Sequence, residues 1–381
     1  MPFDFGALRR TPDVEGPGLE ASDAADRLIL DEAAALIDAT GPGELVVVDD
    51  SYGALALAAA DAGARGIRVH QDLVTGERAL ALNAAKLGLS EAVAPVQLSP
   101  ELFAGARLVL MRLPRSLDRL DEVAELVAAH AHPEVVVVAG GRIKHMSLAM
   151  NEVLRGRFDR IDVSHARQKA RLLIARGPRA ASTTSTTGLE WPRRAHHGDL
   201  SLTVVAHGGV FAGTGIDIGT RFLLDQLGAA MPDATRAVDL ACGTGVVASA
   251  LALARPDLRL TATDRSASAV ASARSTAAAN GVADRVEVTQ ADGLELLPDA
   301  SEWLVVLNPP FHSEAAISTG IAAHLFADAA RVLAPGGELW CVWNSHLRYR
   351  PLLERTVGPT RQISRNPKFT VTASVRRPSV E

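Results

Sequence analysis

The sequence contains the run Val305-Val306-Leu307-Asn308-Pro309-Pro310-Phe311-His312. Its apolar start, residues 303–307, predicts a strand of a parallel sheet, because such strands are buried on both faces. The prolines end this strand, since each fixes φ at roughly −65° and has no N–H to donate to a neighbouring strand. Asn308 is therefore expected at the carboxyl end of a strand, where open α/β sheets bind their ligands.

The polar groups of this turn suit the recognition of a planar amino group. The amide oxygen of Asn308 and the backbone carbonyl of Pro309 can accept the two hydrogens of one exocyclic NH2 group. Pro310 continues the turn, and the ring of Phe311 can stack on the ring that carries the amine. A plain turn without a binding role is the alternative interpretation of Asn-Pro-Pro, and the preceding chain bears on the choice.

Apolar strands alternate with amphipathic helices along the chain, which predicts parallel α/β sheets. This alternation of strands and helices occurs twice along the chain, as in a tandem duplication. Residues 238–243 resemble residues 48–53, and residues 303–310 resemble residues 107–114. Chance similarity between two α/β units is the alternative. We predict two tandem Rossmann-like domains.

The predicted boundaries follow from composition. An Ala-, Ser- and Thr-rich stretch followed by Pro192 and a His pair is typical of a linker. We therefore expect a first domain at 1–185, a linker at 186–198 and a second domain at 199–381. Two adjacent histidines without partners in register are typical of a solvent-exposed position, so we expect no metal site.

The first copy lacks the residues that make the second one a candidate site. In place of Gly243-Thr244-Gly245, our alignment gives it Gly53-Ala54-Leu55. In place of Asn308-Pro309-Pro310-Phe311, it has Arg112-Leu113-Pro114-Arg115. We therefore predict a degenerate first domain, which serves as a scaffold or as a binding surface, and a catalytic second domain.

A glycine loop and three acids in the second domain suit a nucleoside-containing cofactor. The loop Ala241-Cys242-Gly243-Thr244-Gly245 joins a strand to a helix, and its glycines let a ligand approach the backbone. Asp264 ends the next strand, where a carboxylate accepts hydrogen bonds from ribose hydroxyls. Asp292 follows a third strand and can receive an adenine amino group, while Asp239 can steady the loop or meet an ammonium group.

Two other interpretations of these residues remain open. A dinucleotide could occupy the glycine loop, but Ala248 takes the place of the third glycine of that motif. Each of the acids could also be a plain helix cap.

The overall composition is that of a globular chain of two domains. It has 381 residues, 48% of them hydrophobic and 22% charged, with a formal net charge of −5. Lys and Arg nevertheless outnumber Asp and Glu by 12 to 4 at 142–194 and by 8 to 2 at 346–381. These basic regions suit a polyanion, with plain solvated helix faces as the alternative. Two cysteines and the lack of an apolar leader or span predict a cytoplasmic protein without a membrane segment.

Taken together, these motifs resemble the class I S-adenosylmethionine-dependent methyltransferases that act on exocyclic or amide nitrogens. The segment Gly209-Val210-Phe211 to Gly215-Ile216-Asp217-Ile218-Gly219-Thr220 is similar to the start of the catalytic domain in bacterial ribosomal RNA guanine-N2 methyltransferases. The closing Asn366-Pro367-Lys368-Phe369 and the tandem layout are also similar to that family, and the ending leans toward its large-subunit branch. One departure is Ala241, where the family usually has glycine.

The resemblance implies a function as well as a fold. We expect a methyl group to pass from S-adenosylmethionine, bound by Asp239, Cys242, Gly243, Gly245, Asp264, Asp292 and Asn308, to the N2 amine of a guanine in 23S rRNA. The catalytic residues would be Asn308, Pro309, Pro310 and Phe311. His312 could take the last proton or contact RNA, and we expect the enzyme to be a monomer. The alternatives are a 16S rRNA enzyme, a protein-glutamine or adenine-N6 methyltransferase, and a non-enzymatic RNA-binding factor.

Overall fold

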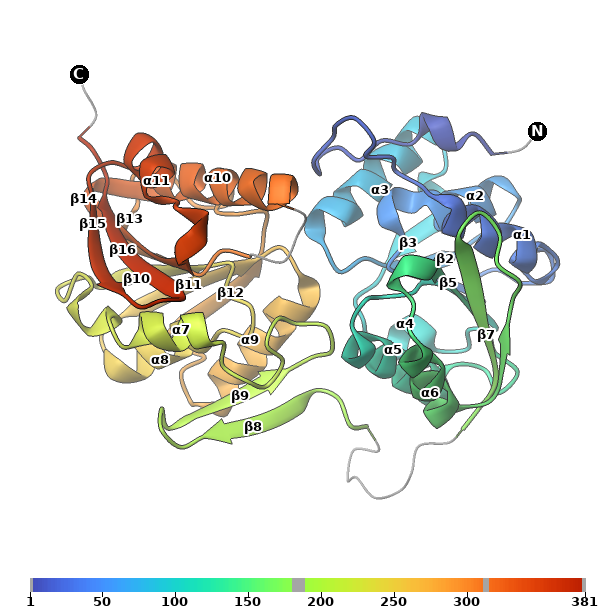
Figure 1. The fold of residues 1–381 in the computed structure, drawn as a ribbon. Coiled ribbons are helices and arrows are strands. Elements are labelled where there is room, and N and C mark those ends of the chain that lie inside the picture. Colours follow the sequence, from blue (N-terminus) through green and yellow to red (C-terminus); the bar gives the residue numbers. More distant parts are fainter. Residues whose placement is uncertain (1–2, 180–188, 311–314, 379–381) are drawn as a thin grey trace. The chain divides into compact units, whose positions relative to one another are not determined.

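The computed structural model describes residues 3–179, 189–310 and 315–378, and they form two compact units that divide between Trp191 and Pro192 (Figure 1). The first unit runs from blue to green in Figure 1 and contains a seven-stranded sheet in the order β3-β2-β1-β4-β5-β7-β6. Its strands are β1 Leu45–Val48, β2 Ile67–His70, β3 Val93–Pro95, β4 Leu108–Arg112, β5 Val136–Arg142, β6 Phe158–Val163 and β7 Ala170–Pro178. Its α-helices are α1 Ala24–Asp38, α2 Ala54–Asp61, α3 Val74–Leu87, α4 Pro100–Phe103, α5 Leu117–His130 and α6 Leu148–Arg157.

The second unit repeats this topology in its own seven-stranded sheet, ordered β12-β11-β10-β13-β14-β16-β15. Its sheet strands are β10 Arg236–Leu240, β11 Arg259–Asp264, β12 Val286–Gln290, β13 Glu302–Leu307, β14 Leu333–Asn344, β15 Thr360–Arg365 and β16 Phe369–Val375. Its α-helices are α7 Ile218–Leu224, α8 Val246–Ala254, α9 Ala267–Ala279, α10 Ala315–Val332 and α11 Arg350–Thr356. The identical strand order confirms the prediction of two tandem Rossmann-like domains.

Both sheets are covered by helices on their two faces, which explains the continuous apolar runs in the sequence. In the first unit, α1 and α2 pack on one face, while α4, α5 and α6 pack on the other. In the second unit, α8 and α9 cover one face, and α10 and α11 cover the other. Strand β13 contains the predicted run, and Val305, Val306 and Leu307 are fully buried between these layers.

The segment predicted as a linker, residues 186–198, contains ordered structure that composition did not reveal. Trp191 belongs to the first unit, because its indole Nε1–H donates to Asp121 of α5 at 3.0 Å. Residues Arg193–His197 form β8, which pairs with β9, Leu202–Ala206. The hairpin is held in place because β9 and the residue after it bond to side chains of α9 and of its C-cap residue. These bonds join Thr203 to Asn280, Val205 to Thr276 and His207 to Ser272, at 2.7–3.1 Å.

The structure also shifts the alignment of the two glycine loops by two residues. Five residues separate β1 from α2, and five separate β10 from α8, so Gly53 corresponds to Gly245 and not to Gly243. Both glycines occupy the N-cap position with positive φ, 93° and 71°. The residue that corresponds to Gly243 is Ser51, so the first copy retains the glycine that starts the helix and lacks the one at the middle of the loop.

Arg112, the counterpart of Asn308, lies in a partly buried ion-pair cluster. Its guanidinium donates to Asp23 at 2.6 Å and to Asp26 at 2.8 Å. Asp23 is the N-cap of α1, and Asp26 is 1% exposed. Burial opposes the ionisation of Asp23, but the guanidinium of Arg112 lowers its pKa to about 2. The cluster thus ties β4 to the start of α1.

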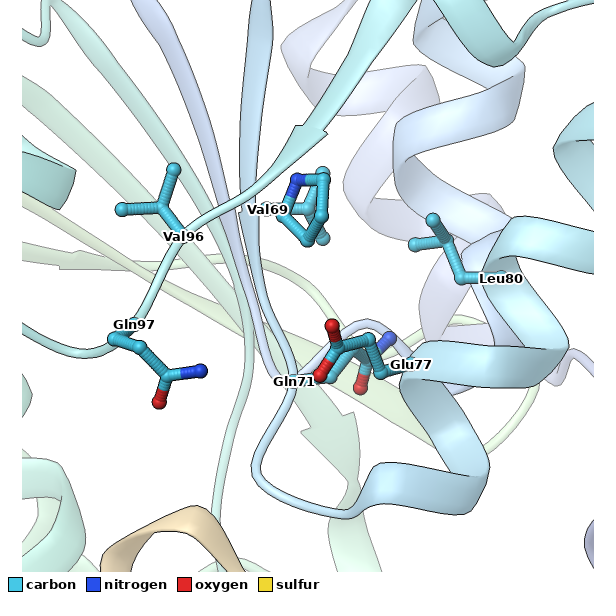
Figure 2. Close-up of a pocket in the computed structure, with 7 residues that line it drawn as sticks. Val69, Gln71, Glu77, Leu80, Val96 and Gln97 are labelled. Carbon is cyan, nitrogen blue, oxygen red and sulfur yellow. The ribbon is translucent and has the colours of Figure 1, made fainter. Parts of the chain in front are cut away.

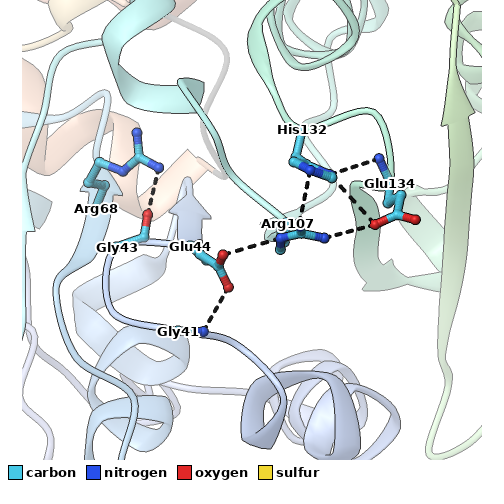
Figure 3. Close-up of polar contacts among 7 residues, drawn as sticks. All are labelled: Gly41, Gly43, Glu44, Arg68, Arg107, His132 and Glu134. Atoms are coloured by element: carbon cyan, nitrogen blue, oxygen red, sulfur yellow. Dashed lines mark hydrogen bonds and ion pairs between the residues drawn. The ribbon is translucent and has the colours of Figure 1, made fainter.

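A second arginine, Arg107, makes its ion pairs near the surface at the opposite end of the same strand. Figure 3 shows Arg107 between Glu44, His132 and Glu134. Its side chain is 41% exposed, and it lies 3.2 Å from Glu44 and 2.9 Å from Glu134. Arg107 therefore offers a matched comparison for Arg112.

Replacing Arg112 with Met should lower the free energy of unfolding of the first domain by about 3 kcal/mol, because Asp26 remains buried beside Asp23 without its cation. The Arg107→Met change should cost no more than about 1 kcal/mol, because water screens its pairs. Urea unfolding of the full chain, followed by circular dichroism, measures both. Equal losses for the two variants would contradict the role given to burial.

The two glycines of the loop between β10 and α8 should differ in their tolerance of alanine. A Cβ atom at Gly245 would lie 2.8 Å from Ala273 Cβ and 2.9 Å from Ala273 Cα, whereas one at Gly243 would meet nothing within 4 Å. Gly245→Ala should therefore cost about 3 kcal/mol, from left-handed backbone strain and a clash with α9. Gly243→Ala should cost about 1 kcal/mol, from strain alone. Thermal unfolding of both variants measures these two costs. A larger loss of stability for Gly243→Ala than for Gly245→Ala would contradict the prediction.

Candidate active site

The loop between β10 and α8 is held by the neighbouring strand β11. Its backbone takes left-handed φ values at Ala241, Gly243 and Gly245, of 57°, 54° and 71°. Cys242 N–H donates to the carbonyl of Thr263 at 3.0 Å, and this bond ties the loop to β11. The φ of Ala241 explains why glycine is favoured there, since a Cβ in this region costs about 1 kcal/mol.

Asp264 stands at the end of β11 and contacts the middle of the loop. One carboxylate oxygen accepts a hydrogen bond from Gly243 N–H at 2.9 Å, and the other accepts from Ser266 N–H at 2.9 Å. Two backbone donors fix the plane of the carboxylate. A carboxylate at the end of this strand is the kind of group that accepts hydrogen bonds from ligand hydroxyls.

Asp239 lies beneath the loop and is almost fully buried. Its carboxylate accepts a hydrogen bond from Ala248 N–H of α8 at 2.9 Å and is 3% exposed. Burial, reinforced by the negative charge of Asp264, raises the pKa of Asp239 to about 7. The observed contact is therefore with the helix that follows the loop, which corresponds to the steadying role.

Of the other two predicted cofactor residues, Cys242 lies in the loop itself and Asp292 lies after β12. Burial raises the pKa of the Cys242 thiol well above its usual range, and the charges of Asp264 and Asp239 add to this, so the thiol stays protonated. Asp292 follows β12, and its side chain is 26% exposed. Its N–H donates to Glu295 at 3.0 Å, and its carboxylate lies 3.9 Å from Nε2 of His324 in α10.

Asn308 directly follows β13, and its side-chain amide is fixed from one side. Nδ2–H donates to the hydroxyl of Thr220 at 2.9 Å and to the carboxylate of Asp217 at 3.4 Å. The amide oxygen Oδ1 is buried and has no hydrogen-bond partner among the residues that the structure describes. A buried acceptor left unpaired costs about 1–3 kcal/mol, so Oδ1 is an acceptor that awaits a donor.

Sheet register brings these side chains to one edge. In the sheet, Leu240 lies level with Thr263 of β11 and with Leu307 of β13. Asp264 and Asn308 are the next residues of those two strands, so they flank the glycine loop. The strand order reverses at β10, and this is where open α/β sheets bind ligands.

The remaining members of the predicted turn are described in part. Pro309 is buried and Pro310 is exposed. Phe311 and His312 lie outside the described residues, so their expected roles in stacking and proton transfer stay predictions. No group of three or more His, Cys, Asp or Glu within the described ranges could hold a metal ion, and no helix of those ranges is long and apolar enough to cross a membrane.

Sequence reasoning missed the two residues that orient Asn308. Asp217 is the N-cap of α7, and its carboxylate accepts from Gly219 N–H at 2.8 Å and from Thr220 N–H at 3.2 Å. An acid three residues before a threonine at a helix start was a signal for the cap. Nothing in the spacing showed that this helix start faces the end of β13, because 88 residues separate Thr220 from Asn308.

The residues at this edge of the sheet have the chemistry that S-adenosylmethionine requires. A Cβ atom at Gly243 would meet nothing within 4 Å, and the Asp264 carboxylate accepts from the N–H of this glycine. Oδ1 of Asn308 is an acceptor at the same edge with no partner among the described residues. A nucleoside with an amino-acid tail needs a loop that it can approach closely and carboxylates to accept its hydroxyl and amino groups.

Comparisons with known proteins support this assignment. The family model described as Methyltransferase small domain matches residues 201–373, and the RLMG N-terminal domain matches residues 2–179. The chain is 36% identical to the "Ribosomal RNA large subunit methyltransferase G" of Streptomyces coelicolor, over 98% of this chain and 99% of the relative. It is 35% identical to the protein of the same name from Pseudomonas entomophila, over 97% of both chains.

A solved structure is similar over both domains. It is the T. thermophilus 16S rRNA N2 G1207 methyltransferase in complex with AdoMet and guanosine, with a TM-score of 0.72 and 18% identity, and the match covers 96% of this chain and 97% of that one. At this identity the similarity supports the tandem fold. The matches to both domain families and to full-length relatives show that the chain belongs to the ribosomal RNA large subunit methyltransferase G family and is an S-adenosylmethionine-dependent methyltransferase.

Proposed function

We propose that this protein methylates the exocyclic N2 amine of a specific guanine in 23S rRNA. The observation that carries the proposal is the buried, unpaired Oδ1 of Asn308, whose amide NH2 is fixed by Thr220 and Asp217. An amide held from one side presents its oxygen in a defined direction. The names of the full-length relatives support large-subunit RNA as the substrate.

Asn308 and Pro309 perform the positioning. The amino nitrogen of guanine is a poor nucleophile, because its lone pair is delocalised into the ring. Oδ1 of Asn308 and the carbonyl of Pro309 would each accept one of its hydrogens, which favours a pyramidal nitrogen with a free lone pair. S-adenosylmethionine supplies an electrophilic methyl group on its sulfonium. The two carbonyl dipoles would stabilise the positive charge that develops on nitrogen, and the methylated amine would then release one proton to water, so the site needs no strong base. Methyl transfer would convert the sulfonium into a neutral thioether.

The cofactor residues would hold the nucleoside. We infer that Asp264 accepts the ribose hydroxyls and that Asp292 accepts the adenine amino group, while Gly243 and Gly245 let the amino-acid portion approach the loop. Asp239 supports the loop from beneath through Ala248. Cys242 lines the loop as a neutral thiol. Substrate phosphates would meet the two basic regions of the chain, which position RNA without reading its sequence.

A 16S rRNA guanine is the second candidate, because the solved structure that matches both domains is named for a 16S enzyme. Transfer of labelled methyl groups to 16S and 23S rRNA, each as naked RNA and as assembled subunits, separates the two. Mapping the methylated nucleotide in the preferred RNA then identifies the position. Incorporation into 16S rRNA alone would overturn the large-subunit assignment.

Asn308→Ala should retain cofactor affinity and lower the rate of methyl transfer on the order of 10²–10³-fold, because the oriented acceptor is lost. Single-turnover transfer to rRNA measures the rate, and calorimetry with S-adenosylhomocysteine measures binding. Thr220→Val removes one anchor of the amide and should show a smaller loss, whereas Thr220→Ser keeps the hydroxyl and should approach wild type. Full transfer by Asn308→Ala would refute the role of the amide.

Asp264→Ala should weaken cofactor binding by about 10- to 100-fold, the range expected for a lost charge-assisted hydrogen bond. Titration calorimetry with S-adenosylmethionine measures the change. Asp299→Ala is the matched control, because the side chain of Asp299 is 77% exposed and pairs with Arg331 at the surface. If both variants bind like wild type, Asp264 has no part in the cofactor site.

A further inference from the structure

The first domain contains a cavity at the sheet edge that corresponds to the cofactor edge of the second. Its volume is about 100 Å³. Val69, Leu80, Pro95 and Val96 supply apolar walls, while Gln71, Glu77 and Gln97 supply polar groups. Figure 2 shows Glu77 and Leu80 on helix α3 facing Val96 and Gln97, which follow strand β3. The cavity thus lies between a helix and the ends of two strands.

Strand register shows which residues of the second domain correspond to those that line this cavity. Val48 of β1 lies level with His70 of β2, just as Leu240 lies level with Thr263. The residue after His70 is Gln71, so Gln71 takes the position of Asp264. The first copy therefore replaces a carboxylate with an amide at the point where the second copy is expected to hold a ribose.

Gln71 has an unsatisfied donor in the cavity wall. Its Nε2 atom is buried and has no hydrogen-bond partner in the described parts of the chain. Glu77 supplies a carboxylate to the same cavity from α3, and Gln97 supplies a second amide. An unpaired buried amide donor is costly, and it gains most from a ligand with an acceptor at its edge.

The N-terminal segment contacts the first-domain loop that corresponds to the glycine loop of the second domain. The hydroxyl of Tyr52 donates to Asp13 at 2.6 Å, and the guanidinium of Arg10 lies 4.7 Å from the centre of the Tyr52 ring. Asn83 of α3 donates to the carbonyls of Arg9 and Tyr52, at 2.8 and 2.9 Å. These contacts lock the segment over the position that the open glycine loop occupies in the second copy.

Size and polarity therefore select the ligand. A cavity of about 150 Å³ holds one benzene molecule, so this smaller cavity admits only the edge of a single flat ring and excludes a nucleoside with an amino-acid tail. Apolar walls on two sides with amide and carboxylate groups at the edge suit a ring that carries both donors and acceptors. We propose that this cavity binds the edge of one nucleobase, with Gln71 Nε2 donating to a ring acceptor and Glu77 accepting from an exocyclic amine.

The proposal goes beyond the methyl transfer assigned to the second domain and does not depend on it. A nucleobase can reach the cavity as a free nucleotide or as an unpaired base of an RNA strand. Both sources present the same ring chemistry, and the experiment includes one arm for each.

The test uses the full chain with saturating S-adenosylhomocysteine, which occupies the second-domain cofactor site. Saturation-transfer NMR titrations use the four nucleoside 5′-monophosphates in one arm and a short single-stranded RNA in the other. The Asn308→Ala background removes a contribution from the acceptor guanine site. Gln71→Leu removes the amide at nearly constant size, Val96→Phe fills the cavity, and Gln362→Leu changes an exposed glutamine of β15 as the matched control.

Gln71→Leu should weaken binding of at least one nucleotide or of the RNA about 5- to 20-fold. Val96→Phe should abolish that binding, and Gln362→Leu should leave it unchanged. The arm that shows this pattern identifies the source of the base. Binding that Gln71→Leu does not change, or no binding in either arm at millimolar concentration, overturns the proposal and leaves the methyl-transfer assignment untouched.

Discussion

The fixed amide of Asn308 is the interaction on which the interpretation of this enzyme depends. Thr220 and Asp217 hold its NH2 group, and the opposite oxygen is left buried and unpaired. A side-chain amide that rotates freely can present either its NH2 donor or its oxygen acceptor to a ligand. Here the donor end is already used, so the site presents only an acceptor, which matches the hydrogens of an amine.

The same position in the first domain shows how one scaffold supports two outcomes. Arg112 replaces Asn308, and Asp26 replaces Thr220, while Asp23 and Asp217 both cap the helix that faces the strand end. In the first copy, the guanidinium and two carboxylates satisfy each other. In the second copy, the amide NH2 of Asn308 bonds to Thr220 and Asp217, and the amide oxygen Oδ1 is left without a partner among the described residues. Divergence therefore changed the chemistry at the sheet edge and left the strand order intact.

The glycine loop follows the same logic. Both copies keep the glycine that starts the helix, because a side chain there would clash: with Leu57 in the first copy and with Ala273 in the second. Only the second copy has glycine at the middle of the loop, where space is open. Packing within the protein and a left-handed backbone both require the first glycine, whereas only the left-handed backbone of Gly243 restricts the second within the described residues.

The sequence by itself determined the fold class, the duplication, the strand that ends at Asn308 and the acids at successive strand ends. These features follow from local patterns, because burial on both faces of a strand and the type of turn depend on residues that are close together in the sequence. Only the tertiary structure decided the loop register, the ordered hairpin inside the expected linker, and the contacts of Asp217 and Thr220 with Asn308. Those features depend on which distant segments come into contact. The hydrogen bond between Thr220 and Asn308 joins residues 88 positions apart, and no local sequence pattern indicates it. Asp239 illustrates both levels, because its place at a strand end was legible in the sequence, whereas its contact with Ala248 required the fold.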